Sequence, residues 1–112
     1  MYRKIGMSRQ EEIIARIVGI ADSKYPNSEV FLFGSRARGD NNSISDWDLL
    51  FLLDQNTVPF DLETALMDDM YELELETNNV FSPIVYSKNE WKNKYSSTQL
   101  FENIRQDGIR IK

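Results

Sequence analysis

Two short hydrophobic runs, with a polar segment between them, constrain the fold of this chain more than any other feature. The runs are Val30 to Phe33 and Leu49 to Leu53, and residues of the types Gly, Asn, Ser and Asp border them. Neither run is long enough to span a membrane, and both have the length and apolar content of buried strands. We therefore expect two adjacent strands joined by the segment GSRARGDNNSISDWD.

Two aspartates, Asp46 and Asp48, stand at the head of the second run with one residue between them. Residues i and i+2 of a strand point to the same face, so we expect both carboxylates side by side, with Trp47 directed away from them into the core. Close carboxylates repel each other and attract a cation, and their oxygens suit Mg²⁺. The pattern predicts a site for phosphoryl or nucleotidyl transfer. The alternative is that both aspartates only cap the loop before the strand.

Gly34 and Ser35 follow the first run directly. A glycine lets a ligand approach the backbone, and if a helical turn begins at Arg36, its free N–H groups point at an anion. We expect the Ser35 hydroxyl to donate to a phosphate oxygen, and the guanidinium groups of Arg36 and Arg38 to bind phosphate. The alternatives are a simple tight turn at Gly34 and surface ion pairs between the arginines and neighbours such as Asp40.

Together, the segments GSRARG and SDWDLL resemble the signature of the DNA polymerase β-like nucleotidyltransferase superfamily, a Gly-Ser turn followed by Asp-x-Asp. Within it, the chain is similar to the minimal nucleotidyltransferases, many of which are antitoxins encoded beside a helical HEPN ribonuclease toxin. The resemblance implies an α/β (α+β) fold with a small mixed β-sheet flanked by helices. It also implies one or two Mg²⁺ ions, ATP as the donor, and transfer of AMP to a tyrosine of the toxin.

The same family usually adds a third carboxylate on a later strand, between apolar residues. The segment Tyr71 to Glu76 alternates in polarity, so we expect a strand with three glutamates on one face. Glu74, between two leucines, is the first choice for the third catalytic and metal-binding carboxylate, with Glu76 and Glu72 as alternatives. The other interpretation of these glutamates is a solvated strand face.

Composition excludes several classes of function. The chain has 112 residues, which predicts one domain over residues 1–112 without a separate substrate-binding domain. Its formal net charge of -5 disfavours extended contact with nucleic acid, so we expect a protein or a small molecule as the acceptor. Cys and His are absent, which excludes thiolate zinc sites and the Ser-His-Asp triad and favours metal-dependent mechanisms. No signal peptide or membrane span is recognisable, so we expect a cytoplasmic protein.

Capping residues and hydrophobic periodicity predict the remaining elements. Ser8 with Glu11 fits a capping box, and apolar residues at helical spacing predict a helix to about Lys24. The other expected elements are a helix capped by Asp61, a hairpin-like turn at Asn78-Asn79 before a strand from Val80 to Tyr86, and helices that begin near Ser87 and Thr98.

The last third of the chain is expected to be structural rather than catalytic. Pro83 predicts that its strand lies at a sheet edge or contains a bulge. Core packing is the favoured role for the late apolar side chains, and a surface covered by a partner is the alternative. These side chains are Trp91, Tyr95, Leu100, Phe101 and Ile104.

Metal-assisted nucleotidyl transfer is the leading hypothesis from the sequence. Asp46 and Asp48 would hold Mg²⁺ while an acceptor hydroxyl attacks the α-phosphorus in line with the leaving pyrophosphate. One alternative is a catalytically inactive antitoxin that neutralises its partner by covering it. The other is a transferase that modifies a small molecule such as an aminoglycoside. No motif encodes the donor base or the oligomeric state.

Overall fold

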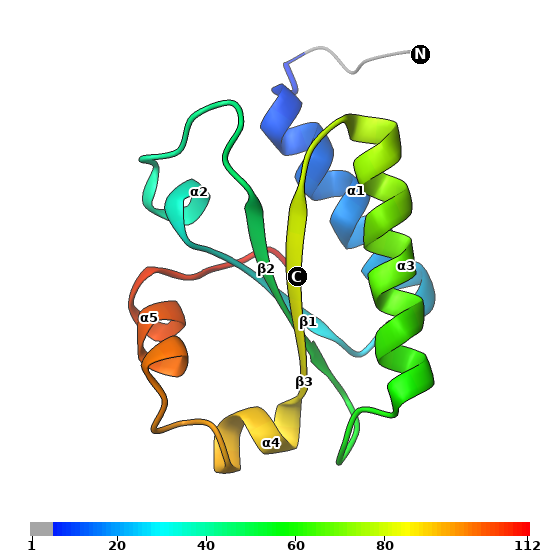
Figure 1. The fold of residues 1–112 in the computed structure, drawn as a ribbon, viewed down its shortest axis with the longest axis vertical. Helices are drawn as coiled ribbons and strands as arrows, with labels where there is room; N and C mark the ends of the chain where they lie inside the picture. Colours follow the sequence, from blue (N-terminus) through cyan, green and yellow to red (C-terminus); the bar gives the residue numbers. More distant parts are fainter. Residues whose placement is uncertain (1–5) are drawn as a thin grey trace.

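The computed structural model describes residues 6–112, and its first element is helix α1, Arg9–Lys24 (Figure 1). Ser8 Oγ accepts the N–H of Glu11 at 3.1 Å, and the Glu11 carboxylate accepts the N–H of Ser8 at 3.3 Å. This reciprocal pair is the predicted capping box. Ile13, Ile17 and Ala21 recur at helical spacing and give α1 its buried face, so the predicted helix is confirmed.

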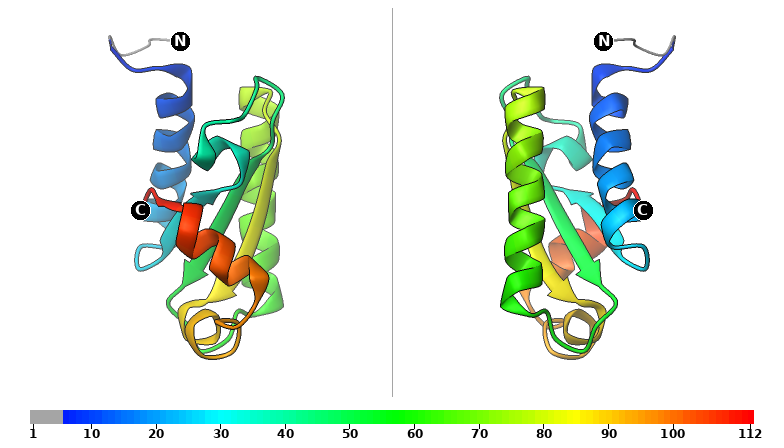
Figure 2. Two further views of the ribbon diagram at one scale, coloured as in Figure 1. Left: turned by 90° about the vertical axis from the view of Figure 1, so that its left-hand side faces the viewer. Right: turned by 90° about the vertical axis from the view of Figure 1, so that its right-hand side faces the viewer.

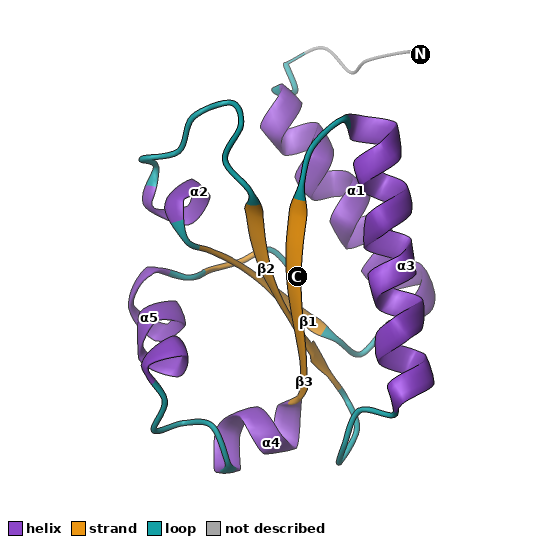
Figure 3. Cartoon of the chain, in the orientation of Figure 1, coloured by secondary structure: helices purple, strands orange, loops and turns teal. Residues whose placement is uncertain are grey.

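Four strands form one mixed sheet in the order β3-β2-β1-β4, and Figure 3 labels the first three of these. Strand β1, Glu29–Phe33, runs antiparallel to β2, Trp47–Leu53, and also to the short β4, Ile109–Arg110. Strand β3, Phe81–Ser87, runs parallel to β2 and lies at the edge of the sheet. The edge position agrees with the prediction from Pro83, because proline has no N–H to donate to a further strand. The expected small mixed sheet is confirmed.

Helix α3, Phe60–Thr77, replaces two predicted features. Residues 71–76 belong to this helix, so the predicted strand with three glutamates on one face is wrong, and so is the hairpin at Asn78-Asn79. The leucines that gave the alternating pattern lie in opposite environments, since Leu73 is 1% exposed and Leu75 is 70% exposed. Helical spacing prevails because it buries a longer series of side chains, namely Leu66, Met70, Leu73 and Thr77.

The ends of α3 also differ from the prediction. Pro59 occupies the N-cap position without a capping side chain, and Asp61 Oδ1 accepts the N–H of Leu62 within the first turn instead of capping the helix. Asn78 ends the helix in the left-handed conformation, with φ 56°, and its N–H donates to the Glu74 carbonyl. The chain therefore leaves a helix here, and crosses over to the parallel strand β3.

The two predicted C-terminal helices are confirmed. Helix α4, Lys88–Asn93, begins after Ser87, whose hydroxyl accepts the N–H of Glu90 at 2.9 Å. Helix α5, Gln99–Asp107, begins after Thr98, whose hydroxyl accepts the N–H of Phe101 at 3.2 Å. These Ser and Thr caps satisfy N–H groups that a helix start leaves without an internal partner.

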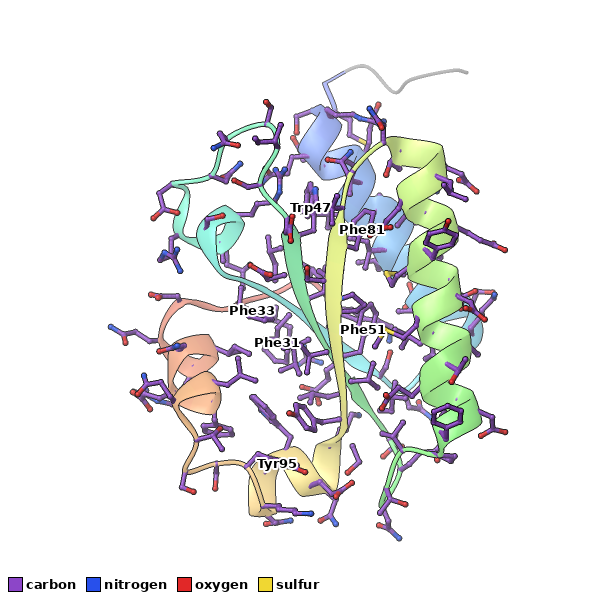
Figure 4. All side chains as sticks on the ribbon, viewed as in Figure 1. Phe31, Phe33, Trp47, Phe51, Phe81 and Tyr95 are labelled. Atoms are coloured by element: carbon purple, nitrogen blue, oxygen red, sulfur yellow. The ribbon has the colours of Figure 1, made fainter. Side chains whose placement is uncertain are left out.

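Helices lie on both faces of the sheet (Figure 2), and a hydrophobic core lies beneath the helices on each face. Helices α1 and α3 cover one face, where the larger core includes Trp47, Phe51 and Phe81. Helices α4 and α5 cover the other face, where a smaller core includes Phe31 and Phe33 (Figure 4). The late apolar side chains belong to this second core, with Trp91 and Ile104 buried and Tyr95, Leu100 and Phe101 half-buried, which confirms core packing as their role. Within residues 6–112, no helix combines the length and the hydrophobicity that crossing a bilayer needs.

Candidate active site

The Gly-Ser turn lies directly at the end of β1. Gly34 has φ 74° and ψ -155°, and helix α2, Ser35–Arg38, follows it, so the predicted helical turn is confirmed. The N–H groups of Ala37 and Arg38 both donate to the Gly34 carbonyl at 3.1 Å. The amides that precede them, including that of Ser35, stand at the start of a helical turn, where no carbonyl of the same turn can accept them. Glycine adopts such a positive φ without steric strain because it has no Cβ.

The second aspartate packs against this glycine. Asp48 pairs with Phe33 in the antiparallel register of β1 and β2. A Cβ placed on Gly34 would collide with Asp48 Oδ2 and would stand 3.1 Å from Asp48 Cγ. Gly34 therefore leaves the space in which the Asp48 carboxylate lies. Two predicted parts of the site, which are fourteen residues apart in the chain, meet at one end of two adjacent strands.

Asp46 lies just before β2 and is exposed, whereas Asp48 is half-buried. The hydroxyl of Ser82 donates to Asp46 Oδ2 at 3.1 Å. Ser82 is also the residue of β3 that pairs with Asp48 in the parallel register. Asp48 on β2, Ser82 on β3 and Asp46 just before β2 thus present three oxygen-bearing side chains.

The electrostatics of the site favour a bound cation. Burial raises the pKa of Asp48, the negative charge of Asp46 raises it further, and the positive charge of Arg38 acts in the opposite direction. The ionised form of Asp48 is therefore held in an environment that disfavours it. A divalent cation between the two carboxylates would remove their repulsion.

Arg36, a predicted phosphate-binding residue, forms contacts within the chain. Its side chain is buried, and its Nε and Nη2 atoms donate to the Ser45 carbonyl at 3.1 and 2.7 Å. Its guanidinium carbon lies 4.4 Å from the ring centroid of Trp47, in a cation–π contact. Burial lowers the pKa of Arg36, and the negative charge of Asp46 counteracts this effect. These contacts anchor the loop that carries Asp46, and contact of Arg36 with phosphate stays a prediction.

Arg38 is exposed and close to the carboxylates. Its Nε lies 3.3 Å from Asp40 Oδ2, which is the surface ion pair considered as an alternative from the sequence. Such an exposed pair contributes little to stability. The guanidinium can therefore exchange Asp40 for a bound anion at small energetic expense.

A hollow of about 320 Å³ lies beside the turn. Some of the side chains that line it come from the last third of the chain, for which the sequence predicted a structural role only. Its wall comprises Phe33, Gly34, Arg38, Leu100, Asn103 and Asp107. The last three belong to α5, so the C-terminal helix contributes to the surroundings of the site as well as to the second core. No local motif marks Asn103 or Asp107, because α5 reaches Gly34 only through the tertiary fold.

Comparison with known proteins defines the family. The family model described as "Nucleotidyltransferase domain" matches residues 14–105. This chain is a member of that nucleotidyltransferase family. A search of curated proteins finds no match.

Solved structures similar to this nucleotidyltransferase domain include three chains from toxin–antitoxin crystals. One is from a toxin–antitoxin with AMP-PNP, with a TM-score of 0.65, 18% identity, and coverage of 88% of this chain and 72% of that chain. A second is from a toxin–antitoxin MntA-HpeT mutant with two Asp-to-Glu substitutions, with a TM-score of 0.62, 14% identity, and coverage of 88% and 72%. A third, from a MntA-HpeT mutant with a Tyr-to-Ala substitution, has a TM-score of 0.59, 17% identity, and coverage of 86% and 68%. At these identities the likeness concerns the fold, which is the polymerase β-like nucleotidyltransferase fold.

The expected third carboxylate is not where the sequence placed it. Because residues 71–76 are helical, Glu74 points away from Glu72 and Glu76, which share one side of α3. Glu74 Oε1 accepts the N–H of Phe81 at 2.9 Å, and Glu76 pairs with Arg16. Among residues 6–112, no three acidic side chains are grouped in a way that could hold a metal ion. Strand β3, which pairs with β2, contains no carboxylate, and Ser82 is its residue that pairs with Asp48.

Proposed function

We propose that this nucleotidyltransferase domain transfers a nucleoside monophosphate, AMP from ATP, to a hydroxyl group of a protein acceptor. One observation carries the proposal: the carboxylate of Asp48 lies directly against the Gly34 turn. A phosphate-binding turn and a metal-binding carboxylate must be this close if one triphosphate is to contact both. The membership of the nucleotidyltransferase family supports the same reaction class.

The residues present fit a divalent cation of the Mg²⁺ type. Asp46, Asp48 and Ser82 offer oxygen atoms only, which suit a hard cation that retains waters and takes further oxygens from a substrate phosphate. The raised pKa of Asp48 reflects the same need for positive charge. We propose that Asp46 and Asp48 hold one or two Mg²⁺ ions. Bound Mg²⁺ would neutralise charge on the phosphates and favour the ionised form of the attacking hydroxyl.

The chain's own side chains would bind and orient the donor. We propose that the Ser35 hydroxyl and the amides at the start of α2 hold the terminal phosphates, and that Arg38 neutralises part of their charge. Ser82 would keep Asp46 in position through its hydrogen bond. In the reaction, the acceptor oxygen forms a bond to the α-phosphorus as the bond to the bridging oxygen breaks. Pyrophosphate leaves with that electron pair, and the hydroxyl proton passes to a carboxylate or to solvent, because the chain contains no His.

We further propose that the protein is an antitoxin and that its acceptor is a toxin, specifically a small helical protein of the HEPN type. Toxin–antitoxin complexes among the structural neighbours support a toxin partner, and the neighbour with AMP-PNP supports an adenine nucleotide as donor. A reaction that consumes ATP is consistent with a cytoplasmic location.

The decisive experiment uses ATP labelled at the α-phosphate, Mg²⁺ and three acceptors: the product of a neighbouring reading frame, this chain itself, and an aminoglycoside. We expect label on the protein partner, release of pyrophosphate, and loss of both in Asp46→Asn and Asp48→Asn variants. Label on the aminoglycoside would instead support the small-molecule transferase. A variant with both substitutions, Asp46→Asn and Asp48→Asn, is also tested for neutralisation of the toxin, measured as cell growth. Neutralisation by this variant would support an inactive antitoxin that acts by covering its partner.

A further inference from the structure

Exposed apolar side chains gather along one side of helix α3. Phe60 is 83% exposed, Tyr71 is 59% exposed and Leu75 is 70% exposed. Spacings of eleven and fifteen residues from Phe60 return to the same side of a helix with 3.6 residues per turn. We call this set, Phe60, Tyr71 and Leu75, the α3 stripe. It runs along about 22 Å of the helix, at 1.5 Å per residue.

The α3 stripe is bordered by negative charge. Helix α3 contains seven acidic residues and no Lys or Arg. Each stripe residue has an acidic neighbour three residues away on the helix surface: Glu63 beside Phe60, Asp68 beside Tyr71, and Glu72 beside Leu75. Other carboxylates of α3 are used internally, since Asp69 pairs with Lys24 at 2.6 Å and Glu76 pairs with Arg16. The pKa of Lys24 is raised chiefly by Asp69 and to a smaller extent by Glu72, whereas Glu63 and Asp68 form no ion pair within residues 6–112. Most of the charge of the border is therefore available to another molecule.

The C-terminal end of the α3 stripe leads to the candidate active site. Glu74, next to Leu75, accepts the N–H of Phe81 at the start of β3. Val80, the residue before Phe81, is 53% exposed, and its carbonyl accepts the N–H of Trp47 at 2.9 Å. Val80 is therefore beside the Asp46–Trp47 segment. A molecule that lies along the stripe and continues past Leu75 reaches the end of the sheet where the carboxylates are.

We propose that the α3 stripe docks a basic, amphipathic segment of the acceptor protein and directs that protein toward Asp46 and Asp48. That this partner is also the acceptor of the nucleotide rests on the proposed function. The apolar and charged contacts that would bind it to the stripe do not depend on that function. Apolar side chains of such a segment would cover the stripe while its Lys or Arg side chains pair with the acidic border.

The charge of the surface decides between the partner classes. A second copy of the chain would bring an equally acidic helix against this one, which is repulsive. Nucleic acid and anionic membranes are repelled for the same reason. A basic protein segment is the class that satisfies both the apolar stripe and its border.

The test measures binding of a fluorescent Leu/Lys peptide to the whole protein by anisotropy. The peptide forms an amphipathic helix of about fourteen residues, which matches the length of the stripe at 1.5 Å per residue. We expect Phe60→Ser and Leu75→Ser each to weaken binding about tenfold, because each removes a large apolar contact at one end of the stripe. Because both side chains are exposed, we expect circular dichroism and Tm to stay unchanged. Ile44→Ser is the matched control, since Ile44 is 86% exposed but lies outside α3, and it should leave binding unchanged.

Several results would overturn the docking proposal. One is that Ile44→Ser weakens peptide binding as much as Phe60→Ser and Leu75→Ser do. Another is that a peptide of the same composition with scattered apolar residues binds with the same affinity. The third is that the amphipathic peptide does not bind the protein. Sedimentation showing a dimer that Leu75→Ser dissociates would assign the stripe to a second copy instead, and binding to phosphatidylserine vesicles that Leu75→Ser abolishes would assign it to a membrane. Asp48→Asn separates the two proposals, because it should abolish transfer and leave peptide binding intact.

Discussion

The two faces of the sheet differ in how completely they are covered, and strand β2 contributes to both. Its residues Trp47, Leu49, Phe51 and Leu53 point toward the long helices α1 and α3 and belong to the larger core. Its alternate residues, Leu50 and Leu52, point toward the short helices α4 and α5, and Asp48 precedes them on the same face. Along β2, every side chain on the first face is apolar, whereas the second face begins with a carboxylate.

This difference shows how a small domain accommodates a charged site. A carboxylate inside the larger core would lose its hydration without compensation, at a cost of several kcal/mol. At the end of the second face, Asp48 stays half-buried, because α5 leaves a hollow beside Gly34 instead of sealing it. The larger core thus stabilises the sheet, and the lighter cover on the other side leaves room for a substrate.

The largest expected effect comes from replacing the carboxylate on the lightly covered face. Asp48→Asn should reduce nucleotidyl transfer by about a thousandfold, because an amide is a weaker ligand for a divalent cation and the lost stabilisation is roughly 4 kcal/mol. Initial rates of pyrophosphate release measure the effect. Asp54→Asn is the control, since Asp54 is an exposed carboxylate directly after the opposite end of β2. Comparable loss in both variants would contradict a specific role for Asp48.

The second prediction compares the two cores by making the same Leu-to-Ala substitution at two positions of β2. Leu49 is 0% exposed on the α1 and α3 face, and Leu52 is 5% exposed on the α4 and α5 face. We expect Leu49→Ala to lower the free energy of unfolding by about 4 kcal/mol and Leu52→Ala by about 2.5 kcal/mol, because Leu49 is more completely buried and lies in the larger core. Urea denaturation measures both losses. Equal losses would show that the two faces are packed equally well.

A smaller effect is expected from the hydroxyl that supports Asp46. Ser82→Ala removes the hydrogen bond to Asp46 Oδ2, and a single neutral donor to a carboxylate is worth roughly 1 to 2 kcal/mol. We therefore expect kcat/KM for transfer to fall about tenfold, with little change in Tm. Ser43→Ala, at an exposed position of the preceding loop, should leave kcat/KM unchanged. An unchanged rate in Ser82→Ala would remove Ser82 from the site.

The smallest effect concerns the dependence of stability on pH. The pKa of Asp48 is raised above its ordinary value of 3.8, so the folded state binds its proton more tightly than the unfolded state does. Stability contributed by this group is therefore lost as pH rises from 3.8 through the raised pKa. Asp48→Asn should raise Tm by a few degrees at most at neutral pH, and the gain should vanish in acid. A gain that is independent of pH would contradict the electrostatic origin.

Local sequence features predicted the elements whose signals do not depend on distant contacts. The capping residues Ser8, Ser87 and Thr98 each begin the expected helix, because a hydroxyl that accepts an N–H three residues later acts within one turn. The strand predicted for residues 71–76 was wrong because distant contacts decided the structure of this segment. Its alternation is six residues long, and packing of α3 against the sheet and α1 selected a helix that buries Leu73 and exposes Leu75.

The sequence by itself determined the starts of three helices, the two central strands, and the glycine that permits a positive φ at position 34, because each follows from local backbone geometry. Only the tertiary structure decided that Asp48 packs against Gly34, that Arg36 anchors the loop at Ser45, and that Ser82 stands beside the aspartates. These contacts join residues that strand pairing and helix packing bring together, and no short segment contains the information that sets such a register.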